Sequence, residues 1–264
     1  MEVDQPGGNL SILPVRLVLE GRTRSEEVML RNTGKGKATY RILFTEMVMN
    51  VNGEIEECAK PVGQTTAADL IRYSPRQVEL APGETQIVRI QVRKPEGLPD
   101  GEYRSHLLFQ SVPDAKPPAP LQGDVGRALS VKLNTVLGIS IPVILRHGDT
   151  HGKVSLTDLR YWTPDQAKNP GAPPVLSFHM VREGNRSLSG DVSAVVESGG
   201  RLKKGTVLWE TKGNVIYTGL PWRHVHLPMY QGKNGDLNGM RVKVTFTPTD
   251  FKGTPVVAYL DIPA

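Results

Sequence analysis

Apolar and polar residues alternate with a period of two along most of the chain, which is the pattern of β-strands with one buried face. In the first half this pattern predicts strands over 12–19, 28–30, 40–49, 86–92 and 103–112. Asn52-Gly53 is a strong hairpin signal, and Pro-Gly or Asp-Gly turns separate the later strands. Because almost no segment has the 3.6-residue period of a helix, we expect an all-β fold built as an antiparallel sandwich.

The most regular alternation lies between Leu129 and Leu145, where nearly every odd position is apolar. At about 3.3 Å a residue this predicts a strand of roughly 55 Å, about three times the usual length. A small sandwich cannot cover such a strand, so we expect part of its apolar face to be exposed for a partner. The Pro- and Gly-rich segment 114–126 before it predicts a mobile loop that becomes ordered on binding.

The segment 146–152 contains two glycines and breaks the alternation, which predicts a hinge between two domains, 1–148 and 149–264. Beyond the hinge the pattern predicts a second sandwich. Its expected strands are 153–159, 175–181, 191–196, 205–209, 214–218, 224–228, 241–247 and 255–262.

Composition agrees with this picture and excludes several classes of protein. Glycine and proline contribute 27 and 21 of the 264 residues, and both disfavour helix interiors. The net charge of +5 is spread along the chain and aromatic residues make up only 6%, so we expect no nucleic-acid-binding surface. A single cysteine rules out an internal disulfide, and no apolar run is long enough for a membrane span.

Candidate chemistry is sparse. His224 and His226 share one strand face, but no third ligand follows from the spacing, so we expect no metal site. Cys58 follows Glu56 and Glu57, which should raise its pKa and suppress its nucleophilicity. With no motif for a nucleophilic serine, a phosphate-binding loop or a dinucleotide, we expect neither catalytic residues nor a cofactor.

Recognition by strand addition is the remaining hypothesis. A long alternating strand can offer its open edge to another chain, with main-chain hydrogen bonds supplying affinity and alternate side chains supplying selectivity. The alternation by itself slightly favours the other interpretation, in which 129–145 is a long core strand within one sandwich.

The order of several short motifs resembles the periplasmic pilus-assembly chaperones of the chaperone–usher pathway (PapD-like), as a divergent branch. The motifs are 13–21, 28–32, Ser74-Pro75, 82–89, 98–105 and 138–146, and in the second half Arg186-Ser187 and 250–256. The resemblance implies two immunoglobulin-like domains at an angle with a cleft between them, in a periplasmic protein whose export signal has been removed. It also implies a non-enzyme that binds pilus or fimbrial subunits by donor-strand complementation and delivers them to an outer-membrane usher.

The resemblance assigns roles to individual residues. Arg16 matches the cleft arginine that holds the subunit's terminal carboxylate, and Arg89 is a weak candidate for a second anchor. A lysine of better-known members is replaced here by Pro142, which leaves that second anchor in doubt. Donor-strand residues would be Leu133, Thr135, Leu137 and Ile139, extended by Leu129 and Val131, and an interdomain ion network would join Glu102, Arg146 and Asp250.

Two alternatives stay open. An adhesion or carbohydrate-binding module of two sandwiches would need an exposed aromatic platform, for which Trp162, Trp209 and Trp222 are available. A β-sandwich glycosidase would need two converging carboxylates in a pocket. The empty protein could also self-associate through its free strand edge.

Overall fold

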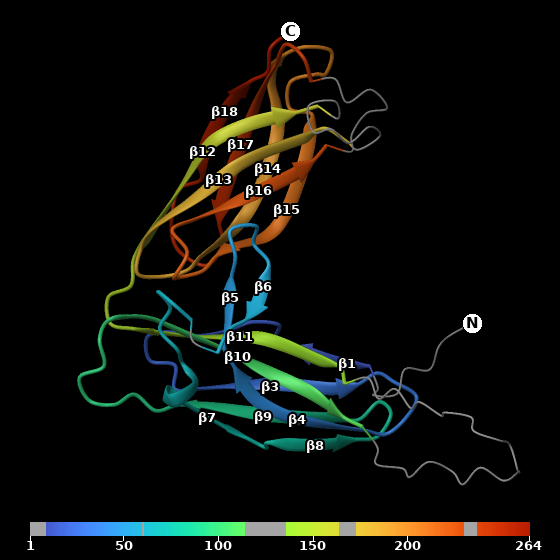
Figure 1. Ribbon diagram of the computed structural model, residues 1–264, viewed down its shortest axis with the longest axis vertical. Helices are drawn as coiled ribbons and strands as arrows, with labels where there is room; N and C mark the ends of the chain where they lie inside the picture. Colours follow the sequence, from blue (N-terminus) through green and yellow to red (C-terminus); the bar gives the residue numbers. More distant parts are fainter. Residues whose placement is uncertain (1–8, 60, 114–135, 164–172, 230–236) are drawn as a thin grey trace, which may run out of the picture. The chain divides into compact units, whose positions relative to one another are not determined.

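A computed structural model describes residues 9–59, 61–113, 136–163, 173–229 and 237–264. Its regular structure is β-strand apart from one 3-10 turn, η1 (Ala68–Leu70), which confirms the all-β prediction. The chain divides into two compact units (Figure 1). Unit 1 consists of Met1–Glu46, Thr66–Leu98 and Tyr103–Arg146. Unit 2 consists of His147–Ala264 together with two segments that interrupt unit 1 in sequence, Met47–Thr65 and Pro99–Glu102. Within the described residues, no helix is long and apolar enough to span a membrane.

Unit 1 is a sandwich of two sheets around one apolar core. Its four-stranded sheet has the order β1 (Leu10–Leu13), β3 (Ser25–Asn32), β9 (Thr85–Val92), β7 (Ile71–Ser74). Its five-stranded sheet has the order β2 (Leu17–Leu19), β11 (Gly138–His147), β10 (Gly101–Val112), β4 (Ala38–Thr45), β8 (Gln77–Leu80). This is the strand order of an immunoglobulin-type sandwich, and alternate residues such as Val28, Val88 and Phe109 fill its interior.

The predicted single strand over 12–19 is wrong, because the chain changes sheets within it. β1 ends at Leu13, residues 14–16 are not in a strand, and β2 begins at Leu17 in the opposite sheet. Pro14 has no N–H to continue a ladder, so the strand is interrupted there. We call residues 14–16 the crossover.

Unit 2 is a second sandwich. One sheet has the order β12 (Gly152–Trp162), β13 (Val175–Gly184), β16 (Trp222–Pro228), and the other β15 (Val207–Ile216), β14 (Leu188–Gly199), β17 (Met240–Pro248), β18 (Val256–Asp261). The predicted hairpin at Asn52-Gly53 is confirmed as β5 (Met47–Met49) and β6 (Ile55–Glu57), which group with this unit. Phe178 and Phe246 are fully buried in its core.

The predicted separate strands 205–209 and 214–218 are wrong and form most of one strand, β15. Gly213 adopts a left-handed φ of 67° and donates its N–H to Asp191 Oδ1, beside a register shift between Gly190 and Val192. The glycine therefore makes a bulge within the strand instead of a turn. The domain boundary at 148 and the cleft between domains stay predictions.

Candidate partner-binding site

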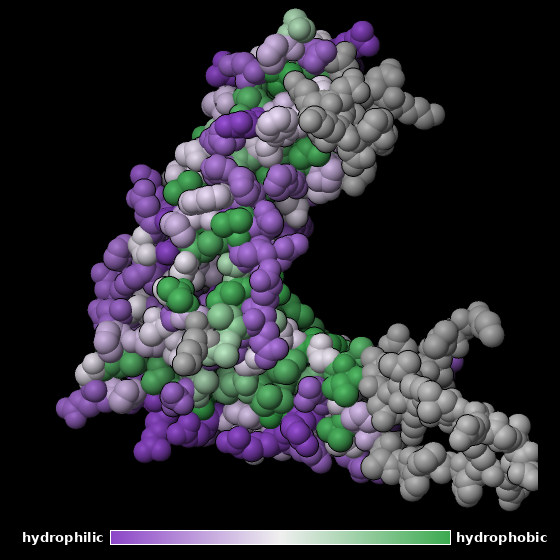
Figure 2. Space-filling view, in the orientation of Figure 1, coloured by the Kyte–Doolittle hydropathy of each residue, from purple (hydrophilic) through white to green (hydrophobic). Residues whose placement is uncertain are grey.

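One face of β11 passes from the core of unit 1 into solvent. Ile141, Val143 and Leu145 are at most 2% exposed, whereas Ile139 on the same strand is 43% exposed and Leu137, the residue before the strand, is 39% exposed. Hydrophobic side chains also reach the surface of unit 1 in Figure 2. The 129–145 segment is thus a regular strand only from Gly138 within the described residues, and Leu129, Val131, Leu133 and Thr135 lie outside them.

The edge of β11 that faces β2 is covered over a short stretch. The two strands pair in parallel at three positions, from Val143 opposite Leu17 to Leu145 opposite Leu19. On its other side β11 neighbours β10, where the Ser111 N–H donates to the carbonyl oxygen of Leu137 at 2.8 Å. The N-terminal half of β11, which carries the exposed side chains, therefore precedes the ladder with β2.

Arg16 and Pro142 mark the point at which that ladder begins. One step back from the Val143–Leu17 pair, the register places Pro142 opposite Arg16. Pro142 has no N–H to donate, which suits the end of a ladder or an open edge. Arg16 is half-buried at the end of the crossover, so its side chain lies where the ladder between β2 and β11 begins.

Arg89 lies in the other sheet of unit 1, on β9. Its neighbours Val88 and Ile90 are buried while Arg89 is exposed, as the alternation predicts. Its Nε is 3.3 Å from Glu27 Oε1 on the adjacent strand β3. The weak assignment of Arg89 as a second anchor stays a prediction.

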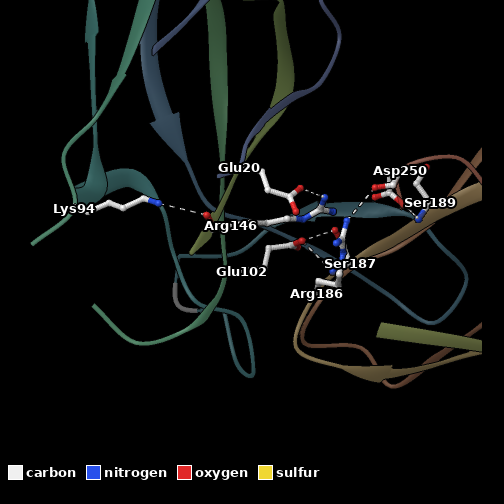
Figure 3. Close-up of polar contacts among 8 residues, drawn as sticks. All are labelled: Glu20, Lys94, Glu102, Arg146, Arg186, Ser187, Ser189 and Asp250. Carbon is white, nitrogen blue, oxygen red and sulfur yellow. Dashed lines mark hydrogen bonds and ion pairs between the residues drawn. The ribbon is translucent and has the colours of Figure 1, made fainter. Parts of the chain in front are cut away.

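Glu102 and Asp250 both bind the chain around the start of β14 in unit 2 (Figure 3). The buried Glu102 accepts hydrogen bonds at Oε2 from the Ser187 N–H at 3.0 Å and the Ser187 hydroxyl at 2.8 Å. Asp250 Oδ1 accepts from the Ser189 N–H at 3.0 Å, and its main-chain carbonyl accepts from Arg186 Nη2 at 3.0 Å. The two carboxylates thus fix the turn between β13 and β14.

Arg146 belongs to unit 1. Its buried guanidinium donates from Nη1 to Glu20 Oε2 at 3.0 Å, and its carbonyl oxygen accepts from Lys94 Nζ at 3.5 Å (Figure 3). Burial, with Arg24 nearby, lowers the pKa of Lys94. An ion network joining Arg146 to Glu102 and Asp250 stays a prediction.

A buried polar cluster on β10 was missed by the sequence analysis. The Ser105 hydroxyl donates to Glu46 Oε1 at 2.5 Å and accepts from the N–H groups of Ala67 and Ala68 at 2.9 and 3.0 Å. Burial raises the pKa of Glu46 and lowers that of His106 to about 4. The sequence contains a feature that could have indicated this cluster, because Arg104-Ser105-His106 are three consecutive polar residues within a predicted strand. In the structure all three are buried.

The alternative sites receive little support from the described residues. Trp162 and Trp222 belong to one sheet of unit 2, whereas Trp209 belongs to the other, so the three do not share one sheet face. The Trp222 ring stacks on His179 at 4.6 Å. In the same described ranges, no group of three or more histidine, cysteine, aspartate or glutamate side chains is arranged to hold a metal ion.

Known proteins resemble the chain in structure only. No protein-family model matches it, and no curated protein matches its sequence. Solved structures that match nearly the whole chain include the Escherichia coli chaperone DraB (14% identity, 97% of this chain and 98% of that one, TM-score 0.49). Others are the CsuC–CsuE chaperone–tip adhesion subunit complex of Acinetobacter baumannii (14%, 95% and 97%, 0.46) and the Pseudomonas aeruginosa CupB2 chaperone (11%, 96% and 100%, 0.47).

Proposed function

We propose that this protein is a non-enzymatic periplasmic chaperone that caps pilus subunits by donor-strand complementation and delivers them to an outer-membrane usher. The observation that carries the proposal is the apolar face of β11, which is buried from Ile141 to Leu145 and exposed at Leu137 and Ile139. A strand that continues its own core face into solvent can complete the core of another sandwich. Capping of this kind protects an aggregation-prone open edge on the partner.

In this proposal the incoming strand lies in line with β2 and pairs with the N-terminal half of β11. Main-chain hydrogen bonds along the edge supply affinity, and Leu137 and Ile139 enter the subunit's groove. Leu129, Val131, Leu133 and Thr135 would extend the donor face over residues that the structure does not describe. The same edge would allow empty copies to self-associate.

Arg16 is the proposed anchor for the subunit's terminal carboxylate. A guanidinium binds a carboxylate through two parallel hydrogen bonds, which fixes the register of the added strand as well as its affinity. Its place at the head of the β2–β11 ladder supports this role. Glu102, Arg146 and Asp250 would set the angle between the domains, since buried ion pairs contribute more to geometry than to net stability.

Co-expression with a candidate pilus subunit tests the proposal. Wild-type protein should give a soluble complex, and Arg16→Ala should weaken it by about 30-fold to several thousand-fold, the equivalent of about 2–5 kcal/mol for a truncated buried charge pair. Ile139→Asp should abolish capture, because a carboxylate would enter an apolar groove. Arg72→Ala, an exposed arginine on the edge strand β7 of the other sheet, is the matched control and should capture normally. Soluble complexes of wild-type yield with both site variants would refute the proposal.

A further inference from the structure

An exposed apolar row crosses three strands on the outer face of the four-stranded sheet of unit 1. The register places Leu13 of β1 opposite Met29 of β3, and Met29 opposite Ile87 of β9. These side chains are 52%, 40% and 44% exposed, while their neighbours Val28, Leu30 and Val88 point into the core. We call Leu13, Met29 and Ile87 the outer row.

Polar residues border the outer row on both sides. On one side the adjacent row is Ser11, Arg31 and Thr85, and on the other Glu27 is paired with Arg89. An apolar strip rimmed by polar and charged side chains is typical of a surface that contacts another protein. Single exposed apolar residues need no explanation, but three in register across adjacent strands form one continuous contact surface.

The outer row is continuous with the proposed partner-binding site. Leu13 is the last residue of β1, and the crossover that follows it leads through Val15, which is 68% exposed, to Arg16. β2 occupies the edge of β11 only from Val143 onward, so a strand added ahead of β2 must lie beside the crossover. A partner held there therefore approaches Val15 and Leu13 first, and Met29 and Ile87 lie beyond Leu13 on the same sheet face.

We propose that the captured pilus subunit also rests on the outer row, so that Leu13, Met29 and Ile87 form a second contact that helps to select it. The inference rests on the proposed function, because a subunit lies beside the crossover, and so next to the outer row, only if one of its strands pairs with β11. The recognised chemistry is an apolar surface patch on the subunit body, separate from the groove that receives the donor strand. Contacts outside the groove would distinguish subunits whose grooves are alike.

Oxidation of Met29 tests the inference in the unmodified protein. Met29 is the most exposed methionine of the described residues, and exposed methionine is converted to the sulfoxide by peroxide. Burial under a subunit should slow formation of the Met29 sulfoxide several-fold, measured by mass spectrometry on the purified complex and on the empty protein. Equal rates in the two samples would overturn the inference. So would protection in the empty protein that grows with its concentration, because that result assigns the row to a second copy of this chain.

Substitution provides a second measurement. Met29→Ser combined with Ile87→Ser should weaken capture by about tenfold or more, the scale of truncating well-packed interface residues. Val257→Ser on β18 of unit 2 removes a similarly exposed side chain, 43% exposed, and should have no effect. If the double variant binds as tightly as wild type while Ile139→Asp loses capture, this inference fails and the proposed function stands. If neither change affects capture, both fail.

Discussion

His106 is a buried imidazole in the polar cluster of β10. It is 3% exposed, and burial, reinforced by the nearby Arg104 charge, lowers its pKa to about 4. The folded protein therefore keeps His106 neutral at a pH where the unfolded chain, with a pKa near 6.5, is protonated. The free energy of unfolding is therefore not reduced by His106 above about pH 6.5, and it decreases as the pH falls from there toward 4.

The loss should amount to about 3 kcal/mol between those pH values. His106→Gln should flatten this part of the pH dependence, measured by hydrogen exchange of the β10 amides. Glu46 acts in the opposite direction, since its raised pKa favours protonation in the folded state, so the difference between wild type and variant isolates His106.

At the scale of elements, close packing at Gly190 fixes how β14 lies against β17. A Cβ on this glycine would stand 2.5 Å from both the Phe246 ring and the Thr247 carbonyl oxygen. Gly190→Ala should therefore destabilise unit 2 by about 1–3 kcal/mol, the usual cost of overpacking. Denaturant unfolding followed by tryptophan fluorescence measures this, because all three tryptophans belong to unit 2. An unshifted midpoint for Gly190→Ala would contradict the packing argument.

The strands themselves could be predicted because alternation follows directly from burial of one face. On β9, for example, Val88 and Ile90 face the core and Arg89 faces solvent, as the alternation predicts. What failed were the boundaries that depend on long-range pairing. The change of sheet after Leu13 and the bulge at Gly213 both depend on which strand pairs with which, and the local alternation of apolar and polar residues does not specify that pairing.

The candidate site could be predicted in part for the same reason. Apolar character at 137 and 139 is visible in the sequence, but their exposure depends on how far the core of unit 1 extends along this face, which is set by the packing of distant segments. The outer row was invisible, since Leu13, Met29 and Ile87 are distant in sequence and meet only through strand register.

At the scale of the whole molecule, the two units are interleaved in sequence. Pro99–Glu102 belongs to unit 2 although unit 1 flanks it on both sides, and Glu102 supplies the acceptor for two Ser187 donors. Glu102→Ala leaves these buried donors without their acceptor, which should destabilise unit 2 by about 2–4 kcal/mol. Glu102→Gln retains an acceptor oxygen and should cost less.

Tryptophan fluorescence reports this effect selectively, because Trp162, Trp209 and Trp222 all belong to unit 2 and the chain has three tryptophans. The unfolding midpoint seen by fluorescence should fall in Glu102→Ala. An unchanged midpoint would mean that the Ser187 contacts contribute nothing to the stability of unit 2.

The change of environment between Ile139 and Ile141 has a consequence for sequence divergence. If the proposed function holds, neighbouring positions on one side of this segment are under different constraints. Ile141, Val143 and Leu145 are constrained by the folding of this chain, whereas Leu137 and Ile139 would be constrained by the shape of the partner's groove. Relatives that serve other partners are then free to vary before residue 140 while keeping medium-sized aliphatic residues after it. A single strand can in this way acquire a new specificity without any loss of its own fold.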